Sequence, residues 1–371
     1  MTPEETVALA AAALGRRLTD PVDLGGSRRS RVLRCAVGEV QPGATGAALP
    51  DGTTTVVVKQ FLDAAPEFSR ESVGLDVLDR TPELYARDPA NHLLVMSDLG
   101  DLPTLADLLL GDDRERAWQG AHAWARALGE LVGRSRSAVG DARERLAADL
   151  AAEELWDLQT VIGLGLDKLA EAAGDRLDRP AVEAELASIG GLTDPGEAAV
   201  VWPGDTCPDN AVVGTDGWLF LDLEGTGVEH ASAVAAYTVL PFASCWCVFD
   251  PPAGLTDDLL AAFTEGLAVH APQLAGDPAW PLQVRQACAV YSVLAGFWFL
   301  DSAREGRADV GPAGRSPSYR QILGYRWRWG ALNLRDDFPA LAAALGGAAA
   351  WASETWGPDA EIAGYPAFAP A

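Results

Sequence analysis

Two carboxylates and one amide in the middle of the chain have the types and spacing that phosphate chemistry uses. Segment 202–210 contains Asp205 and Asn210, and Asp222 follows at the end of a predicted hairpin strand. Phosphoryl transfer needs a carboxylate that orients or deprotonates the attacking hydroxyl, and oxygen ligands that hold magnesium against the phosphates. Asp205, Asn210 and Asp222 have the right types in the right order. The same spacing also occurs in plain connecting loops, so this motif alone leaves both interpretations open.

A basic residue suited to a phosphate lies upstream. Lys59 is near the end of a β-branched segment, 53–61, and Glu71 follows on a predicted helix. A strand lysine paired with a helix glutamate can hold a cation against the α- and β-phosphates of a nucleotide. The alternative is an exposed strand residue. Lys59 and Lys168 are the only lysines, and the other cationic residues are Arg. A surface cation in this chain would therefore more often be Arg, which favours a phosphate-binding role for Lys59.

A glycine-rich segment joins two predicted strands near the start of the chain. Gly25 and Gly26 are followed by Ser27 and by several arginines within 28–34. Glycine lets the backbone approach phosphates closely, and clustered arginines form a positive patch in an acidic protein. A flexible hairpin with solvated charges is the alternative, because the segment lacks a full G-x-G-x-x-G pattern.

The whole chain is strongly acidic. Its 371 residues include 53 Asp and Glu against 28 Lys and Arg, a formal net charge of −25, which disfavours nucleic-acid binding. Hydrophobic residues make up 49% and charged residues 22%, so a large core can form in one large domain or two lobes. An acidic cleft would suit a cationic amine, although the total charge does not locate the carboxylates.

We expect a cytoplasmic protein without a membrane anchor. The N-terminus is acidic where a secretory signal is positively charged. The nearly apolar stretch 231–249 contains Pro241 and lacks basic anchors, which favours a buried helix pair over a membrane span. The five cysteines lack C-x-x-C spacing, so we expect reduced thiols. Cys245 and Cys247 are expected to be buried and inert, and Cys207 to be either reactive or buried beneath its loop.

The elements around these residues predict the α+β class. A helix that ends near Leu14 is followed by β-rich runs, with the clearest strands at 31–37, 53–61 and 92–96 and a helix at 66–78. Helical patterns then occupy 114–134, 143–172 and 179–187, and resume from 232. Short strands at 198–202, 211–213 and 218–223 interrupt them, with Asp216 and Gly217 as a hairpin turn. We therefore expect a small β-rich lobe and a larger helical lobe, with the Asp205 loop where active sites are common.

The order of these features resembles the aminoglycoside phosphotransferase and choline-kinase-like family. The features are the Gly-Gly-Ser loop, Lys59, Glu71, segment 94–100, Gly204-Asp205 with Asn210, and Asp222-Leu223-Glu224. The resemblance implies a bilobal protein-kinase-like fold, with a nucleotide-binding lobe over 1–97 and a helical lobe with the catalytic loop and substrate site over 98–371. It also implies transfer of the γ-phosphate of ATP or GTP, with Mg²⁺, to a hydroxyl of a small molecule such as an aminoglycoside, choline or a related amine.

The same resemblance assigns roles to individual residues. Asp205 would be the catalytic base, with Asn210 and Asp222 as magnesium ligands. Lys59 would contact the α- and β-phosphates while paired with Glu71. The remaining nucleotide contacts would come from Gly25, Gly26 and Ser27 at the phosphates, and from the hinge 96–100, with Met96 and Asp98, at the adenine through backbone groups. Glu224 stands in an acidic position that often follows the second metal ligand of this family.

One departure from the family pattern concerns catalysis. Pro203 occupies the position where the family's loop usually has His, so it would either stiffen the backbone or signal weakened catalysis. Because Asp205, Asn210, Asp222 and Lys59 are all present, we favour an active enzyme. Two alternatives remain: a Ser/Thr kinase of a peptide in natural-product maturation, with a peptide groove on the helical lobe, and a nucleotide-binding pseudokinase.

Overall fold

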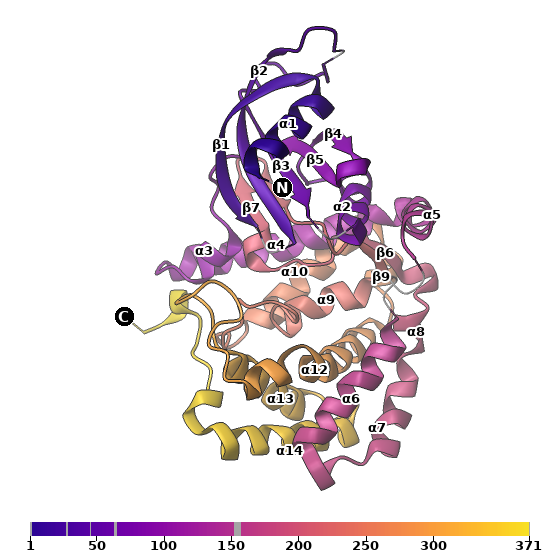
Figure 1. The fold of residues 1–371 in the computed structure, drawn as a ribbon. Coiled ribbons are helices and arrows are strands. Elements are labelled where there is room, and N and C mark those ends of the chain that lie inside the picture. The colour runs from indigo at the N-terminus through magenta and orange to yellow at the C-terminus, as the bar shows by residue number, and fades with distance from the viewer. Residues whose placement is uncertain (1, 27–28, 45, 63–64, 152–156, 371) are drawn as a thin grey trace.

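The structure is a computed structural model that describes residues 2–26, 29–44, 46–62, 65–151 and 157–370. Two lobes of unequal size lie one above the other in Figure 1, a small lobe built on a β-sheet and a larger lobe built mainly of helices. The predicted α+β, two-lobed architecture is therefore confirmed. No helix within the described residues is long and apolar enough to span a bilayer.

The small lobe is a five-stranded antiparallel sheet with two helices. The strand order is β1-β2-β3-β5-β4, and the bounds are β1 (Arg16–Gly26), β2 (Ser30–Val40), β3 (Thr55–Phe61), β4 (Leu84–Asp88) and β5 (Leu93–Ser97), with α1 (Pro3–Leu14) and α2 (Ala65–Val77). Successive strand residues face opposite sides of the sheet. Val56 and Val58 of β3 therefore pack in one cluster with Ala10 and Leu14 of α1, while the opposite face turns toward α2 and the larger lobe.

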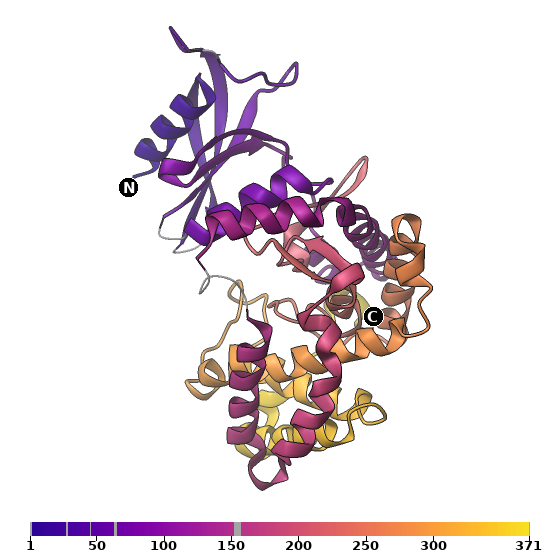
Figure 2. The same ribbon diagram turned by 90° about the vertical axis from the view of Figure 1, so that its right-hand side faces the viewer.

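The larger lobe consists mainly of helices packed around one apolar core. The helices are α3 (Leu105–Leu109), α4 (Arg114–Ser135), α5 (Val139–Asp149), α6 (Leu158–Ala173), α7 (Arg179–Leu186), α8 (Gly190–Thr193), α9 (Ala231–Val239), α10 (Leu255–His270), α11 (Pro272–Ala275), α12 (Trp280–Arg304), α13 (Tyr319–Asn333) and α14 (Pro339–Trp356). Trp124 and Trp327 are fully buried in this core. Figure 2 shows the same lobe from the side, with the helices stacked below the sheet.

Two short two-stranded antiparallel sheets lie between the five-stranded sheet and most of the helices in Figure 1. They pair β6 (Ala199–Trp202) with β9 (Gly227–His230), and β7 (Ala211–Gly214) with β8 (Gly217–Phe220). The loop after β6 and the loop after β8 carry the polar residues singled out in the sequence. The two short sheets therefore place these two loops between the lobes.

Several local predictions need correction. The expected helix at 143–172 is divided, because α5 ends at Asp149 and α6 begins at Leu158. The expected strand at 218–223 ends at Phe220, so Asp222 lies beyond it in a loop. The hairpin pairs Gly214 with Gly217, which shifts the turn to the two residues before Gly217. The apolar stretch 231–249 forms one helix, α9, followed by turns rather than a second helix.

The expectation of five reduced thiols is wrong for two of them. Cys207 and Cys245 form a disulfide across a sequence separation of 38, whereas Cys35, Cys247 and Cys288 are free and buried. The pairing is invisible in the sequence because it depends on the loop after β6 folding back onto the turn after α9. Cys245 and Cys247 are buried, as predicted, and Cys207 is buried beneath its loop.

Candidate active site

Lys59 projects from the middle strand of the small lobe's sheet. On β3 it lies opposite Val32 of β2 and Leu94 of β5, so hydrogen-bonded strands flank it on both sides. It shares its face of the strand with Phe61, the face turned toward α2. Its side chain is buried, and its Nζ lies 4.9 Å from the centroid of the Phe61 ring.

The Lys59 ammonium is held by two carboxylates from different parts of the chain. Nζ lies 2.5 Å from Glu71 Oε2 on α2 and 2.5 Å from Asp222 Oδ1 in the loop after β8. A third carboxylate, that of Glu224, is 3.7 Å away. Burial alone would lower the pKa of Lys59, but the attraction of Glu71 and Asp222 outweighs it and raises that pKa. Burial raises the pKa of Glu71, with the Lys59 charge acting in the opposite direction.

The loop 222–226 contacts α2 at a glycine. A Cβ added at Gly74 would lie 2.4 Å from Thr226 Oγ1 and 3.0 Å from Leu223 Cβ, so this close approach requires glycine on α2. Leu223 is fully buried there, and Asp222 before it has a positive φ of 57°. The left-handed conformation at Asp222 is uncommon outside glycine and redirects the chain, and functional loops often contain such residues.

The Asp205 loop and the Asp222 loop touch through two glycines. Gly204 has a φ of 93°, and a Cβ added there would lie 2.2 Å from the carbonyl carbon of Gly225. Asp205 is therefore held next to the segment that carries Asp222 and Glu224. Burial, followed by the charges of Asp222 and then Asp209, raises the pKa of Asp205 to about 7.

Hydrogen bonds within the loop after β6 fix the orientation of Asp205 and Asn210. The Cys207 backbone N–H donates to Asp205 Oδ1 over 3.2 Å, and Asn210 Nδ2 donates to the Asp205 carbonyl over 3.2 Å. Asp209 accepts a 2.9 Å hydrogen bond from Trp246 Nε1. Together with the Cys207–Cys245 disulfide, that bond fastens the loop to the turn after α9.

The acidic groups between the lobes form a set that suits a divalent cation. One ligand oxygen from each of Glu71, Asp222 and Glu224 lies within 4.8 Å of the others. Magnesium prefers carboxylate and amide oxygens, so these groups fit such an ion together with Asn210 on the neighbouring loop. Glu224 also pairs with Arg29 at 3.1 Å, and Arg29 pairs with Glu67 of α2 at 2.5 Å.

The remaining predicted nucleotide contacts are more scattered. Gly25 and Gly26 lie at the end of β1 in the β1–β2 hairpin, where a Cβ at Gly26 would lie 2.5 Å from the Ser30 carbonyl oxygen. Ser27 lies outside the described residues. Met96 is buried in the cluster with Phe61 and Leu223, so its side chain belongs to the core. The Asp98 carboxylate is engaged by Arg34 at 2.7 Å, which leaves backbone groups for any contact with a base.

A cavity of about 740 Å³ opens beside Asp205 and also reaches Glu224, which belongs to the cluster around Lys59. Its lining includes the charged residues Arg29, Glu67 and Arg70 together with residues of β9, α9 and α12. An adjoining cavity of this size is large enough for a drug-sized molecule. The site therefore consists of a charged cluster around Lys59 and an adjoining pocket, and Glu224 belongs to both.

Sequence reasoning missed the residues that shape this pocket. Glu229 and the aromatic residues of α9 and α12 were not singled out, because β9 has four residues and a strand this short shows little alternation. His230, the last residue of β9, is buried and caps α9 by accepting a hydrogen bond from the Ser232 backbone N–H over 3.1 Å. The sequence signal that could have identified Glu229 is its position, because it is an acidic residue in a short apolar run next to the Asp222 loop.

Comparisons with known proteins agree with this geometry at the level of the fold. No protein-family model matches the sequence, and no curated protein matches it. A choline/ethanolamine kinase family protein from Mesorhizobium loti has a TM-score of 0.50 and 16% identity, over 94% of this chain and 100% of that one. Ethanolamine kinase from Plasmodium vivax has a TM-score of 0.51 and 10% identity, over 87% of this chain and 84% of that one.

A third solved structure extends the comparison. A Ralstonia eutropha protein provisionally assigned to the aminoglycoside phosphotransferases has a TM-score of 0.50 and 12% identity, over 93% of this chain and 98% of that one. The molecule therefore has a protein-kinase-like fold. More specifically, its fold is of the kind found in choline kinases and aminoglycoside phosphotransferases, as the resemblance implied.

Proposed function

We propose that the chain is a magnesium-dependent phosphotransferase that moves the γ-phosphate of ATP, or GTP, to a hydroxyl of a small molecule. The observation that carries this proposal is the junction of Lys59 with Glu71 and Asp222, next to Asp205, which lines an adjoining pocket. A fixed cation beside a carboxylate cluster suits a polyphosphate, and a pocket beside a candidate base suits an acceptor.

The transfer step assigns one role to Asp205. The acceptor oxygen attacks the γ-phosphorus, so an oxygen–phosphorus bond forms while the bond from the γ-phosphorus to the bridging β,γ-oxygen breaks. The nucleoside diphosphate leaves with that electron pair, and the Asp205 carboxylate takes the proton of the acceptor hydroxyl. Most of the rate enhancement would come from positioning and charge stabilisation, as is usual for phosphoryl transfer.

The other site residues bind and orient the nucleotide. Asn210, Asp222 and Glu224 supply oxygen donors for Mg²⁺, which neutralises charge on the phosphates when it is bound. Lys59, oriented by Glu71, contacts the α- and β-phosphates. Gly25 and Gly26 of the β1–β2 hairpin cover the phosphates, and the backbone of 96–100 meets the base.

A cavity of this size favours a small acceptor over an extended peptide, so the peptide-kinase alternative has less support. The pseudokinase alternative rests on Pro203, which is buried next to Gly204 and leaves the Asp205 loop folded. A peptide kinase would turn over ATP with a peptide as acceptor, and a pseudokinase would not turn over ATP. Measuring ATP turnover therefore distinguishes both alternatives from the proposal.

The proposal is tested with two substitutions and two matched controls. Asp205→Asn should lower magnesium-dependent turnover about 100-fold or more while nucleotide binding remains, because general-base catalysis contributes on that order. Asp216→Asn, in the exposed hairpin turn, should leave turnover unchanged. Lys59→Met should weaken nucleotide binding, whereas Lys168→Met should not, since Lys168 lies on α6 and pairs with Asp301.

Turnover and nucleotide affinity would be followed by coupled detection of the diphosphate product and by calorimetry, with circular dichroism to confirm folding. Equal turnover in wild type and Asp205→Asn would contradict the role of Asp205. Binding of nucleotide by the wild type without turnover across a broad panel of alcohols would favour the pseudokinase alternative.

A further inference from the structure

A continuous series of aromatic side chains lines the pocket beyond Asp205. Trp202 contacts Tyr237 with ring centroids 5.4 Å apart, and Tyr237 contacts Tyr291 at 5.7 Å. Tyr291 continues to Trp298 at 6.1 Å, and Trp298 to Phe299 at 6.2 Å. All five residues line the same cavity. The wall therefore offers a ligand aromatic surface mainly at the half-buried Trp202 and Trp298, with the buried Tyr237 and Tyr291 packed between them.

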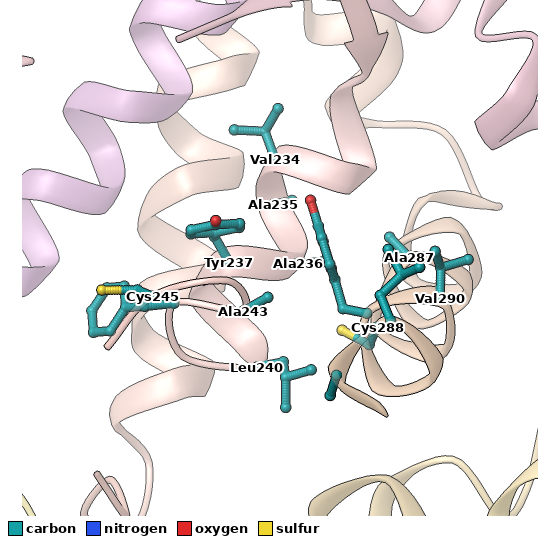
Figure 3. Close-up of a cluster of buried hydrophobic side chains, with 14 of the residues drawn as sticks. Val234, Ala235, Ala236, Tyr237, Leu240, Ala243, Cys245, Ala287, Cys288 and Val290 are labelled. Atoms are coloured by element: carbon teal, nitrogen blue, oxygen red, sulfur yellow. The ribbon is translucent and has the colours of Figure 1, made fainter. Parts of the chain in front are cut away.

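Aliphatic side chains fill the spaces between these rings. Ala233 of α9, Ala287, Val290 and Leu294 of α12, and Leu192 of α8 line the cavity with them. Figure 3 shows a buried cluster in this part of the molecule, with Ala235, Ala236 and Tyr237 labelled on α9 and Ala287, Cys288 and Val290 on α12. Such a wall binds apolar surface well, and the faces of its rings can also contact the cation of a single amine.

The walls formed by β9, α9 and α12 carry one acidic side chain among the described lining residues, that of Glu229. The β6–β9 ladder places Trp202 opposite Gly227 and Val200 opposite Glu229, so Glu229 and Trp202 lie on the same face of the ladder. Burial raises the pKa of Glu229 to about 7, and Arg70 acts in the opposite direction. Three further carboxylates line the pocket: Glu67 and Glu224 pair with Arg29, and Asp205 is the candidate base.

We infer that the acceptor is a ring-bearing alcohol of drug size, with a largely apolar body and one hydrogen-bond donor, such as a single amine, that meets Glu229. The inference rests on the proposed function, because it treats the pocket as the acceptor side of a phosphotransferase. A cavity of about 740 Å³ would be mostly unfilled by an acceptor as small as choline. A polycationic sugar would bring several ammonium groups to a wall that carries one carboxylate.

The first experiment measures binding in the absence of nucleotide and magnesium. The neutral dye N-phenylnaphthylamine should bind the full chain with enhanced fluorescence, and estradiol should displace it at a lower concentration than kanamycin or choline. Trp298→Ala should weaken dye binding about ten-fold, because a large aromatic contact is lost. Trp351→Ala on α14 is the matched control, since Trp351 is also half-buried but packs against Trp327 and Trp356 instead.

Two results would overturn the assignment of an apolar pocket. One is equal dye affinity in Trp298→Ala and Trp351→Ala, which would place the dye elsewhere. The other is displacement by kanamycin or choline at a lower concentration than by estradiol. A loss of folding in Trp298→Ala would be detected by circular dichroism, and Leu294→Ala then replaces it with the same expected direction.

The second experiment tests Glu229 with a matched pair of ligands, adamantanemethanol and its bridgehead-amino derivative. Glu229→Gln keeps the side-chain shape, so it should weaken dye displacement by the amino alcohol about ten-fold and by the plain alcohol less than two-fold. Glu265→Gln, exposed on α10, should change neither. Equal effects on both alcohols, or none on either, would remove Glu229 from the recognition of the amine.

These measurements separate the inference from the proposed function. Dye binding needs no phosphate transfer, so a chain that binds the dye as expected but never turns over ATP would retain the apolar pocket and lose the enzyme assignment. A chain that turns over ATP with kanamycin or choline, but binds neither the dye nor estradiol, would be a phosphotransferase with a different acceptor class.

Discussion

Lys59 is surrounded by more negative charge than it can neutralise. Glu71, Asp222 and Glu224 all lie within 3.7 Å of its ammonium group, and Asp205 is close enough to Asp222 for its pKa to rise. The excess of carboxylates explains why the site suits an additional cation. Lys168, the other lysine, lies on α6, where it pairs with Asp301.

Glu229 should make the stability of the molecule depend on pH. Burial raises its pKa from 4.5 to about 7, so the folded state disfavours the charged form. Its contribution to stability is therefore fully present below about pH 4.5 and is lost as the pH rises through about 7. Relative to Glu229→Gln, the wild type should lose about 2 kcal/mol of unfolding free energy between about pH 5 and pH 8.

Urea unfolding of both proteins at the two pH values measures this difference. Glu265→Gln is the control, because its side chain is exposed and the substitution should follow the wild type at both pH values. A Glu229→Gln variant whose stability changes with pH in parallel with the wild type would show that Glu229 is solvated in the folded protein.

At the scale of elements, the packing of α2 on the loop 222–226 depends on Gly74. Gly74→Ala would bring a Cβ to 2.4 Å from Thr226 Oγ1, so α2 or the loop must move. We expect a loss of about 1–3 kcal/mol of stability, the usual cost of overpacking, together with weaker nucleotide binding because α2 carries Glu71. Thermal unfolding and calorimetry with nucleotide measure the two effects.

Gly163→Ala on α6 is the matched control for Gly74→Ala. No heavy atom lies within 4 Å of a Cβ added at Gly163, so alanine there should stabilise the helix by about 0.5–1 kcal/mol. If both substitutions stabilise the protein, then α2 can move away from the loop without loss of stability. The close approach at Gly74 would then not position Glu71.

The sequence predicts elements well where capping or periodicity is strong. Thr2 with Glu5 forms the capping box that begins α1, and the β-branched run before Phe61 forms β3. It predicts poorly where contacts between distant segments decide the structure. The four residues of β9 become a strand only because β6 pairs with them, and Asp222 lies in a loop because Leu223 packs under α2.

At the scale of the whole molecule, the Cys207–Cys245 disulfide should contribute to global stability. Closing a loop across a separation of 38 restricts the unfolded chain, which corresponds to about 3–4 kcal/mol in the chain-entropy model. A reductant should therefore lower the unfolding free energy of the wild type by about that amount. It should have no effect on the double variant Cys207→Ser, Cys245→Ser, which serves as the control.

Thiol titration of the denatured protein without reductant provides the independent check. Three free thiols are expected, from Cys35, Cys247 and Cys288. Five would show that the chain carries no disulfide, and the stability of the wild type would then be insensitive to reductant.

The two-lobed architecture follows from the sequence more readily than the pocket does. The change from β-rich to helical patterns near residue 100 is visible in the composition of the segments, and so are the residue types of the Asp205 loop. The cavity beside Asp205 is assembled from Trp202, Tyr237, Tyr291 and Glu229, on β6, α9, α12 and β9. These residues form no sequence motif, because they share a cavity in the folded protein and not a regular spacing along the chain.

The disulfide also gives the chain a covalent ring with most of the site inside it. Asn210, Asp222, Glu224 and Glu229 all lie between Cys207 and Cys245. The exposed tip of the β7–β8 hairpin, at Thr215 and Asp216, is also part of this ring. A protease that cuts only at this tip would therefore produce two polypeptides that the bond keeps joined until it is reduced, with Asp222, Glu224 and Glu229 on one fragment and Lys59, Glu71 and Asp205 on the other.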